Sequence, residues 1–443
     1  MSDTIFALSS GLGPAGVAVI RVSGPRAGRA LGEMTGRDLP PPRRASLVGF
    51  SNPATGEALD DGLALWFPGP ASVTGEDVAE IHIHGGRAVI AAVIDALAAQ
   101  PGLRAAEPGE FTRRAFENGK LDLTAAEGLA DLVNAETEAQ RRQARRQLEG
   151  ELGRLYEAWR ERLLTTLAHF EADLDFPDED LPAGIAERLH HNILGLIDEI
   201  SQHLDDNRRG ERLREGFYIA IIGPPNVGKS SLLNRLARRD AAIVSATAGT
   251  TRDVIEVHLD LAGYPVILAD TAGLREGAEE IEGEGVRRAR ARAANADLKL
   301  VLLDASAWPE VDAAVDGFVD ADSVVIINKV DLSTPAPPLR VAERPALPVS
   351  VLTGEGLDGL LKTLEREVAA RLVDSGAVAL TRVRHRAALE ACVAALRRSL
   401  TGALPELAAE DVRLAARSLG RITGRVDVED VLDVIFRDFC IGK

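Results

Sequence analysis

The segment Gly223-Pro-Pro-Asn-Val-Gly-Lys-Ser230 has the residue types and spacing of a phosphate-binding loop. An apolar run at 217–222 precedes it and a helical pattern starts at Ser231, so the loop would join a strand to a helix N-terminus. Backbone N–H groups there can cradle a β-phosphate, Lys229 can neutralise the β- and γ-phosphates, and the Ser230 hydroxyl can bind Mg²⁺. The spacing therefore predicts a nucleoside triphosphate site.

A second motif, Asn328-Lys-Val-Asp331, follows the apolar run 324–327 and predicts which base is bound. The Asp331 carboxylate can accept hydrogen bonds from N1–H and the exocyclic amine of guanine. Adenine lacks both donors, so the unpaired carboxylate would reject ATP. Ser350-Val-Leu352 would form the loop behind the base. We therefore expect GTP.

Two further segments lie where the γ-phosphate sensors of such a site belong. Asp270 begins Asp-Thr-Ala-Gly273 at a strand end, where it can hold Mg²⁺ through water and the Gly273 N–H can contact the γ-phosphate. Thr251, in the run 249–253, is the expected Mg²⁺-sensing threonine. The residues expected to bind GTP are Asn226, Val227, Gly228, Lys229, Ser230, Ser231, Ser245, Thr247, Ala248, Gly249, Thr250, Thr251, Asp270, Thr271, Ala272, Gly273, Asn328, Lys329, Asp331, Ser350, Val351 and Leu352.

The hydrolytic machinery is less evident from the residues. Leu274 follows Gly273 and cannot orient an attacking water as a glutamine would. No arginine finger can be assigned, but Asn226 could ligate a monovalent cation where the charge of such a finger would lie. The acids that could position or deprotonate water are Glu276, Glu279, Glu280, Glu282 and Glu284.

These motifs need a scaffold, and the region 216–372 supplies one. Apolar runs at 217–222, 266–269, 298–303 and 324–327 alternate with helical segments, which predicts a parallel sheet covered on both faces. We expect an inserted α/β P-loop domain of Ras-like type, the G domain.

The flanking regions have different textures. Residues 1–118 contain short alternating runs at 17–22, 63–67 and 78–83 and a helix near 87–100, which predicts an α+β domain. Residues 119–215 and 373–443 are helical and would form one discontinuous all-α domain around the insert. Its expected features are a capping box at Thr124–Glu127, a long helical run ending at Pro177, and helices at 184–213, 381–400, 406–420 and 427–438.

Composition limits the compartment and the partners. The chain has 443 residues and a net charge of −17, which argues against non-specific coating of nucleic acid. With only Cys392 and Cys440, neither a disulfide framework nor a zinc site is expected, and the N-terminus has no signal-peptide pattern. We expect a cytoplasmic protein that does not cross a membrane. The basic runs 141–146 and 382–386 could contact nucleic-acid phosphates or be solvated helix faces.

The combined motifs resemble a known family. Leu65-Trp-Phe-Pro-Gly-Pro70, Pro108-Gly-Glu-Phe-Thr-Arg-Arg-Ala-Phe116 and the terminal Phe439-Cys-Ile-Gly-Lys443 are similar to the tRNA uridine-5-carboxymethylaminomethyl modification GTPases (MnmE/TrmE), with the resemblance running end to end. It implies an N-terminal domain that dimerises and binds a 5-formyl- or methylene-tetrahydrofolate. It also implies G domains that dimerise across K⁺, and an FAD-dependent partner of MnmG/GidA type. Together with this partner, the family installs an aminomethyl-type group at C5 of the wobble uridine of tRNA.

The resemblance also assigns roles to individual residues. Glu282 would be the catalytic acid of switch II, and Ser230 and Thr251 would hold Mg²⁺. Cys440 could be a nucleophile or redox-active thiol, or an ordinary reduced thiol. The K⁺ set would be Asn226, Ser245, Thr247 and Thr250, and the folate set Arg21, Glu80, Lys120 and Lys443.

Two other functions fit the same G motifs. A ribosome-assembly GTPase would bind rRNA and modify nothing, and it would not need Arg21, Glu80 or a cysteine-bearing tail. A non-catalytic conformational switch would use GTP only to position a partner that performs all the chemistry.

Overall fold

The computed structural model describes residues 3–11, 13–175, 185–238, 256–270, 294–307, 317–332, 340–372, 378–401, 404–426, 429–437, 439 and 441–442. The chain divides into two compact units, one built from 1–130, 147–194 and 391–443 and the other from 131–146 and 195–390. Each unit contains one β-sheet. The expected three-domain boundaries at 118, 215 and 372 stay a prediction.

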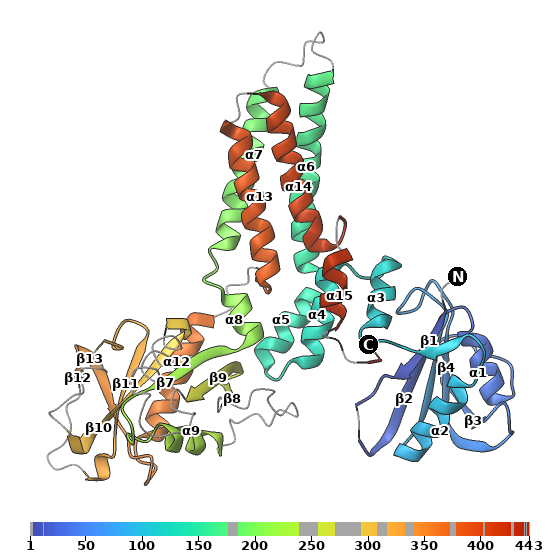
Figure 1. The fold of residues 1–443 in the computed structure, drawn as a ribbon, viewed down its shortest axis with the longest axis horizontal. Helices are drawn as coiled ribbons and strands as arrows, with labels where there is room; N and C mark the ends of the chain where they lie inside the picture. Colours follow the sequence, from blue (N-terminus) through green and yellow to red (C-terminus); the bar gives the residue numbers. More distant parts are fainter. Residues whose placement is uncertain are drawn as a thin grey trace, which may run out of the picture. The chain divides into compact units, whose positions relative to one another are not determined.

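The sheet of the first unit has the strand order β3-β4-β5-β2-β1-β6 (Figure 1). Its neighbours pair antiparallel, except that β1 and β6 are parallel. The runs expected as strands lie within β2, β4 and β5. The strands are β1 (Thr4–Leu8), β2 (Ala15–Ser23), β3 (Ser46–Ser51), β4 (Ala58–Phe67), β5 (Val78–Gly85) and β6 (Leu103–Ala105).

The two faces of this sheet differ because side chains alternate along each strand. Ile20 and Val22 of β2 point into an apolar core together with Leu31 of α1 (Ala27–Thr35) and Leu97 of α2 (Arg87–Ala98). Arg21 and its register partner Glu80 point to the opposite face and remain partly exposed. α3 (Glu110–Glu117) contributes Phe111 to a small cluster with Ile5 and Ala7, at the β1 end of that face.

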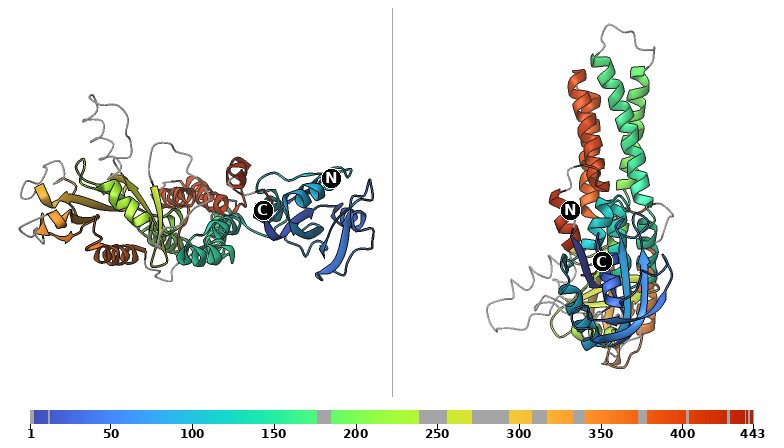
Figure 2. Two further views of the ribbon diagram at one scale, coloured as in Figure 1. Left: turned by 90° about the horizontal axis from the view of Figure 1, so that it is seen from below. Right: turned by 90° about the vertical axis from the view of Figure 1, so that its right-hand side faces the viewer.

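Helices complete the first unit. α6 (Glu151–Asp175) and α14 (Pro405–Thr423) run side by side in both views (Figures 1 and 2). α15 (Glu429–Arg437) packs Leu432 and Phe436 against Leu123 at the start of α4 (Leu123–Asn134). The expected capping box at Thr124 is wrong. Asp122 caps α4 instead, because its carboxylate accepts the Ala125 N–H at 2.8 Å and the Thr124 hydroxyl at 2.7 Å.

The sheet of the second unit has the order β12-β13-β11-β10-β7-β9-β8 among the described residues. The five central strands are parallel, as expected, and β12 and β8 add antiparallel edges. α9 (Lys229–Ala237) and α12 (Leu357–Leu372) pack against one face. The strands are β7 (Phe217–Ile222), β8 (Glu256–Leu261), β9 (Tyr264–Asp270), β10 (Leu298–Asp304), β11 (Ser323–Asn328), β12 (Arg340–Val341) and β13 (Arg344–Pro348), and the 3-10 turns are η1 (Ala305–Ala307) and η2 (Val330–Leu332).

The long helical run expected up to Pro177 is broken into α4, α5 (Glu138–Leu148) and α6. Near the start of α5, the Ala139 N–H donates to the Gly263 carbonyl in the β8–β9 turn at 3.0 Å. Side chains also cap this helix, because the Gln140 N–H donates to the Thr137 hydroxyl oxygen at 3.4 Å and the Thr137 N–H donates to the Gln140 side-chain oxygen at 3.1 Å. α7 (Ile185–Leu204), α8 (Arg209–Glu215) and α13 (Val383–Thr401) lie near the other expected helices. Among the described residues, no helix combines the length and apolarity needed to cross a bilayer.

Candidate functional site

The phosphate loop joins β7 to α9, as its spacing predicts. Asn226 has a φ of 60° and Gly228 a φ of 107°, so the backbone turns through the left-handed region twice before the helix begins. A Cβ on Gly228 would lie 2.4 Å from Asn328 Nδ2. Glycine is therefore required here both by the dihedral and by the close approach of Asn328.

The two side chains expected at the phosphates and at Mg²⁺ face this loop. Lys229 is buried, and its Nζ donates to the carbonyls of Gly223 and Pro224, each at 2.8 Å. Burial lowers the pKa of Lys229, and the nearby Asp270 carboxylate opposes this. The Ser230 hydroxyl donates to Asp270 Oδ2 at 2.5 Å. The Ser230 hydroxyl and the Asp270 carboxylate are oxygen donors at a helix N-terminus, beside Lys229. Oxygen donors of this kind suit a hydrated Mg²⁺ ion bound to phosphates.

Asn328 connects the phosphate loop to the loop behind the base. Its Nδ2 donates to the Val227 carbonyl at 2.7 Å, and its Oδ1 accepts the Val351 N–H at 3.1 Å. The side chain is almost fully buried, so its amide is fixed by these bonds. The expected base loop is thereby held at the end of β11, with Ser350 buried and Leu352 81% exposed.

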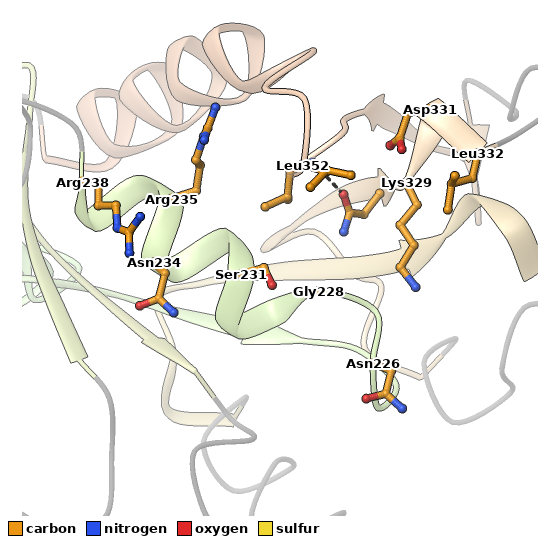
Figure 3. Close-up of a pocket in the computed structure, with 12 residues that line it drawn as sticks. Asn226, Gly228, Ser231, Asn234, Arg235, Arg238, Lys329, Asp331, Leu332 and Leu352 are labelled. Atoms are coloured by element: carbon orange, nitrogen blue, oxygen red, sulfur yellow. Dashed lines mark hydrogen bonds between the residues drawn. The ribbon is translucent and has the colours of Figure 1, made fainter.

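A pocket of about 480 Å³ opens between these loops (Figure 3). Sequence reasoning missed four of the residues that line it, which are Asn234 and Arg235 on α9, Arg238 directly after α9, and Leu332. The helical spacing could have indicated three of them, because positions three, four and seven residues after Ser231 lie on one face of a helix. The pocket is lined by Asn226, Gly228, Ser231, Asn234, Arg235, Arg238, Asn328, Lys329, Asp331, Leu332, Val351 and Leu352.

Several expected site residues lie outside the described part of the chain. They belong to the segments 245–251 and 271–282 and to the C-terminal tail, so their roles stay predictions. They are Ser245, Thr247, Ala248, Gly249, Thr250, Thr251, Thr271, Ala272, Gly273, Glu282, Cys440 and Lys443.

Comparisons with known proteins bear on the family of this chain. A family model described as the GTP-binding protein TrmE N-terminus matches residues 4–120, and one described as the MnmE helical domain matches residues 123–440. A tRNA modification GTPase MnmE from Paramagnetospirillum magneticum is 59% identical over 443 residues, covering 100% of both chains. The chain belongs to the MnmE family. The expected family and enzyme class, a GTPase in tRNA modification, are confirmed.

MnmE relatives extend beyond bacteria. A human mitochondrial protein named 5-taurinomethyluridine-[tRNA] synthase subunit GTPB3 is 52% identical over 458 residues, covering 99% of this chain and 93% of that protein. Among solved structures, Era from Aquifex aeolicus bound to GDP·AlF4⁻ is 27% identical. It covers 42% of this chain and 69% of its own, with a TM-score of 0.27, which is too low to bear on function.

The described residues that the sequence predicts to bind folate lie in the first unit. Arg21 Nη2 donates to Glu80 Oε1 at 2.8 Å, and the guanidinium lies 5.8 Å from the centroid of the Phe111 ring. His82 Nε2 lies 3.3 Å from the other oxygen of Glu80. Lys120 is exposed just after α3, the helix that carries Phe111.

The C-terminal tail of this MnmE chain reaches the same unit. Ile441 forms a β-bridge with Pro108, and the Ser9 hydroxyl donates to the Gly442 carbonyl at 2.8 Å. A Cβ on Gly442 would lie 2.0 Å from the Leu8 carbonyl oxygen, so the tail passes directly against the end of β1. Because Leu8 follows Ala7, which pairs with Arg21, Gly442 lies beside the part of β1 that pairs with the Arg21 segment of β2.

The two basic runs, 382–386 and 141–146, differ in their exposure and ion pairs. Arg382 and Arg386 are mostly buried and ion-paired, because Arg382 donates to Asp131 at 2.8 Å and Arg386 donates to Asp206 at 2.7 Å and to Glu211 at 3.1 Å. The 141–146 run lies on α5, where Arg141 and Arg142 are exposed and both pair with Glu138, each at 2.8 Å. The described arginines of α5 are therefore more accessible to solvent than Arg382 and Arg386.

Proposed function

We propose that this chain is a GTP-hydrolysing tRNA modification enzyme that works with an FAD-dependent partner of MnmG/GidA type. The pair adds an aminomethyl or carboxymethylaminomethyl group at C5 of the wobble uridine of tRNA, using a one-carbon tetrahydrofolate. The observation that carries the proposal is the 59% identity over the whole chain to a tRNA modification GTPase. The guanine-type pocket beside an intact phosphate loop supports it.

In this proposal the chain's own residues bind and orient the nucleotide. The N-terminus of α9 and Lys229 hold the phosphates, Asp331 selects guanine, and Asn328 keeps the two loops in register. Ser230 and Thr251 would hold Mg²⁺, with Asp270 acting through water, and the bound ion would supply charge neutralisation on the phosphates. Glu282 would position the attacking water, since Leu274 cannot.

The same proposal makes hydrolysis depend on K⁺ and on pairing of two G domains. Asn226 supports this, because its left-handed backbone places it at the edge of the pocket (Figure 3). We expect GTP hydrolysis to be about tenfold faster in KCl than in NaCl at equal ionic strength. This corresponds to an activation free energy that is lower by about 1.4 kcal/mol in KCl. The difference should vanish in Asn226→Ala, and specific activity should rise with protein concentration.

Steady-state phosphate release in both salts tests this expectation. Asn234→Ala is a matched control because Asn234 lines the same pocket from α9 rather than from the phosphate loop. It should keep its preference for KCl. Equal wild-type rates in the two salts would exclude the cation role, and a specific activity independent of concentration would exclude activation by dimerisation.

The folate part of the proposal rests on the open face of the N-terminal sheet. Arg21 and Glu80 form a hydrogen-bonded pair that can donate to a carboxylate and accept from a pterin amine. Leu47 and Leu63, paired in register on the same face, are exposed and would suit a homodimer contact. Lys443 and Cys440 would join the site from the tail.

We expect 5-formyltetrahydrofolate to bind the full chain, and Glu80→Gln to weaken binding by about 10–100-fold, the loss of a charge-assisted hydrogen bond. Isothermal titration calorimetry measures this. Glu33→Gln is the control, since Glu33 pairs with Arg29 on α1, whose buried side packs on the opposite sheet face. Unchanged affinity in Glu80→Gln would remove Glu80 from the site.

Mass spectrometry of tRNA wobble nucleosides tests the whole function. Cells without this protein should lack C5-aminomethyl-type uridines, and so should cells without the partner. Wild-type protein should restore them, Lys229→Ala should not, and Cys440→Ser decides whether the tail thiol takes part. An unchanged nucleoside profile would refute tRNA modification and favour the ribosome-assembly alternative. A folate-pocket variant that loses binding yet keeps modification would favour the non-catalytic switch.

A further inference from the structure

Lys329 lies between the two residues that define the base site, Asn328 and Asp331. Its backbone φ is 63°, so the chain turns through the left-handed region at this residue. In Figure 3 its side chain extends along the pocket from the Asp331 side toward Asn226. The ammonium is ion-paired, because Nζ is 2.6 Å from Asp304 Oδ2. Both ends of the side chain are thus constrained.

Asp304 is itself held in place. It ends β10, directly opposite Asn328 in the register of β11. Its Oδ1 accepts the Ser306 N–H at 2.9 Å and the Ser306 hydroxyl at 2.6 Å, which leaves Oδ2 for Lys329. Burial acts to raise the pKa of Asp304, but the hydrogen bonds from Lys329 and Ser306 outweigh it, so the pKa lies below its ordinary value. The carboxylate is an ordered anion at neutral pH.

Lys329 and Asp304 differ in their position relative to the pocket. Lys329 lines the pocket, whereas Asp304 is not among the described residues that do. The lysine, rather than the carboxylate, is therefore the member of the pair that forms the wall of the pocket. A lysine stem that is already ordered loses less side-chain entropy when a ligand packs on its methylenes.

We propose that Asp304 is a positioning residue for guanine-nucleotide binding: it anchors the ammonium of Lys329 so that the lysine stem forms a fixed wall of the base pocket. The inference deepens the proposed GTP site. The opposite possibility is that the ion pair only stabilises the sheet. β10 offers a matched control, because Lys299 at its other end pairs with Asp320 in the same way, away from the pocket.

The test is the affinity and dissociation rate of a fluorescent GDP analogue on the full chain. Asp304→Asn should weaken binding about fivefold to tenfold, mainly through faster dissociation, with an unchanged melting temperature. Asp320→Asn should leave affinity unchanged. In a Lys329→Met background, Asp304→Asn should have no further effect, because the residue acts through the lysine.

A second readout separates positioning from general distortion. The stem would contact the ring face, which GDP and IDP share, so Asp304→Asn should weaken both nucleotides equally. A displaced Asp331 would instead reduce discrimination between them. Ser306→Ala, which removes one hydrogen bond to Asp304, should give a smaller loss of the same kind and serves if Asp304→Asn does not fold.

Unchanged GDP affinity in Asp304→Asn, or losses that add in the double variant, would overturn the inference. An equal loss in Asp320→Asn would also overturn it, since the ion pairs would then be structural. Failure of the wild-type chain to bind any guanine nucleotide is a different result, because it would refute the GTP site itself.

Discussion

Asp331→Asn is expected to weaken GTP binding by about 10⁴-fold and to give the protein affinity for XTP. The Asp331 carboxylate would accept two hydrogen bonds from N1–H and the exocyclic amine of guanine. An asparagine amide keeps one acceptor but turns a donor toward that amine, so one pairing becomes a repulsion between two donors. Xanthine carries a carbonyl oxygen in place of the amine, and the asparagine can donate to it.

Equilibrium binding of fluorescent GTP and XTP analogues, followed by hydrolysis of each, measures the switch. Asp331 is exposed beside the pocket, so the substitution should not alter the melting temperature. Asp322→Asn is the control, since Asp322 belongs to the same domain and pairs with Arg371 at the surface. GTP affinity that stays within about tenfold of wild type would mean that Asp331 does not read the base.

The nucleotide site could be predicted well because its parts are local in sequence. Each motif lies directly after a buried apolar run, and the structure places β7, β9, β10 and β11 over the expected runs. Parallel strands bring their carboxyl ends to one edge, so Gly228, Asp270 and Asn328 had to converge once the strands were recognised. The Asn328 bridge between loops follows from that convergence.

What could not be predicted depends on contacts between distant parts of the chain. The pairing of Asp304 with Lys329 requires knowing that β10 and β11 are neighbours in register, and neither residue alone indicates it. The basic run at 382–386 looked available because its acidic partners, Asp131, Asp206 and Glu211, are remote in sequence. β1, β3 and β6 were missed because short strands carry little periodicity.

Arg114 is the clearest case of such a hidden contact, and its removal carries the second large expected effect. The side chain is 9% exposed and binds three carboxylates, those of Asp3 at 2.8 Å, Glu76 at 3.1 Å and Glu110 at 2.9 Å. Arg114→Ala would leave these acids together with one cation fewer. Because breaking a largely buried ion pair strands the remaining charge, we expect the N-terminal sheet to lose about 3 kcal/mol of stability.

Hydrogen-exchange mass spectrometry can localise that loss. Amides of β1 and β2 should exchange about 100-fold faster in Arg114→Ala under conditions where exchange reports opening free energies. The adjacent Arg113→Ala is the control. Arg113 is 40% exposed and pairs with Glu117 and Asp433 at the surface, so its removal should cost less than about 1 kcal/mol. Similar protection in the two variants would show that the buried network contributes no more than a surface pair.

The pH dependence should identify charge as the cause. Burial acts to raise the pKa of Glu110, but hydrogen bonds from Arg104 and Arg114 outweigh it and bring the pKa below 4.5. The Arg104 hydrogen bond likewise keeps the pKa of Asp3 below 3.8. Groups with a lowered native pKa stabilise the fold above their unfolded pKa and lose that contribution as the pH falls through the native value. The difference between wild type and Arg114→Ala should therefore be largest near neutrality and shrink below about pH 4. A difference that stays constant from pH 7 to pH 3.5 would point to lost packing of the arginine stem instead.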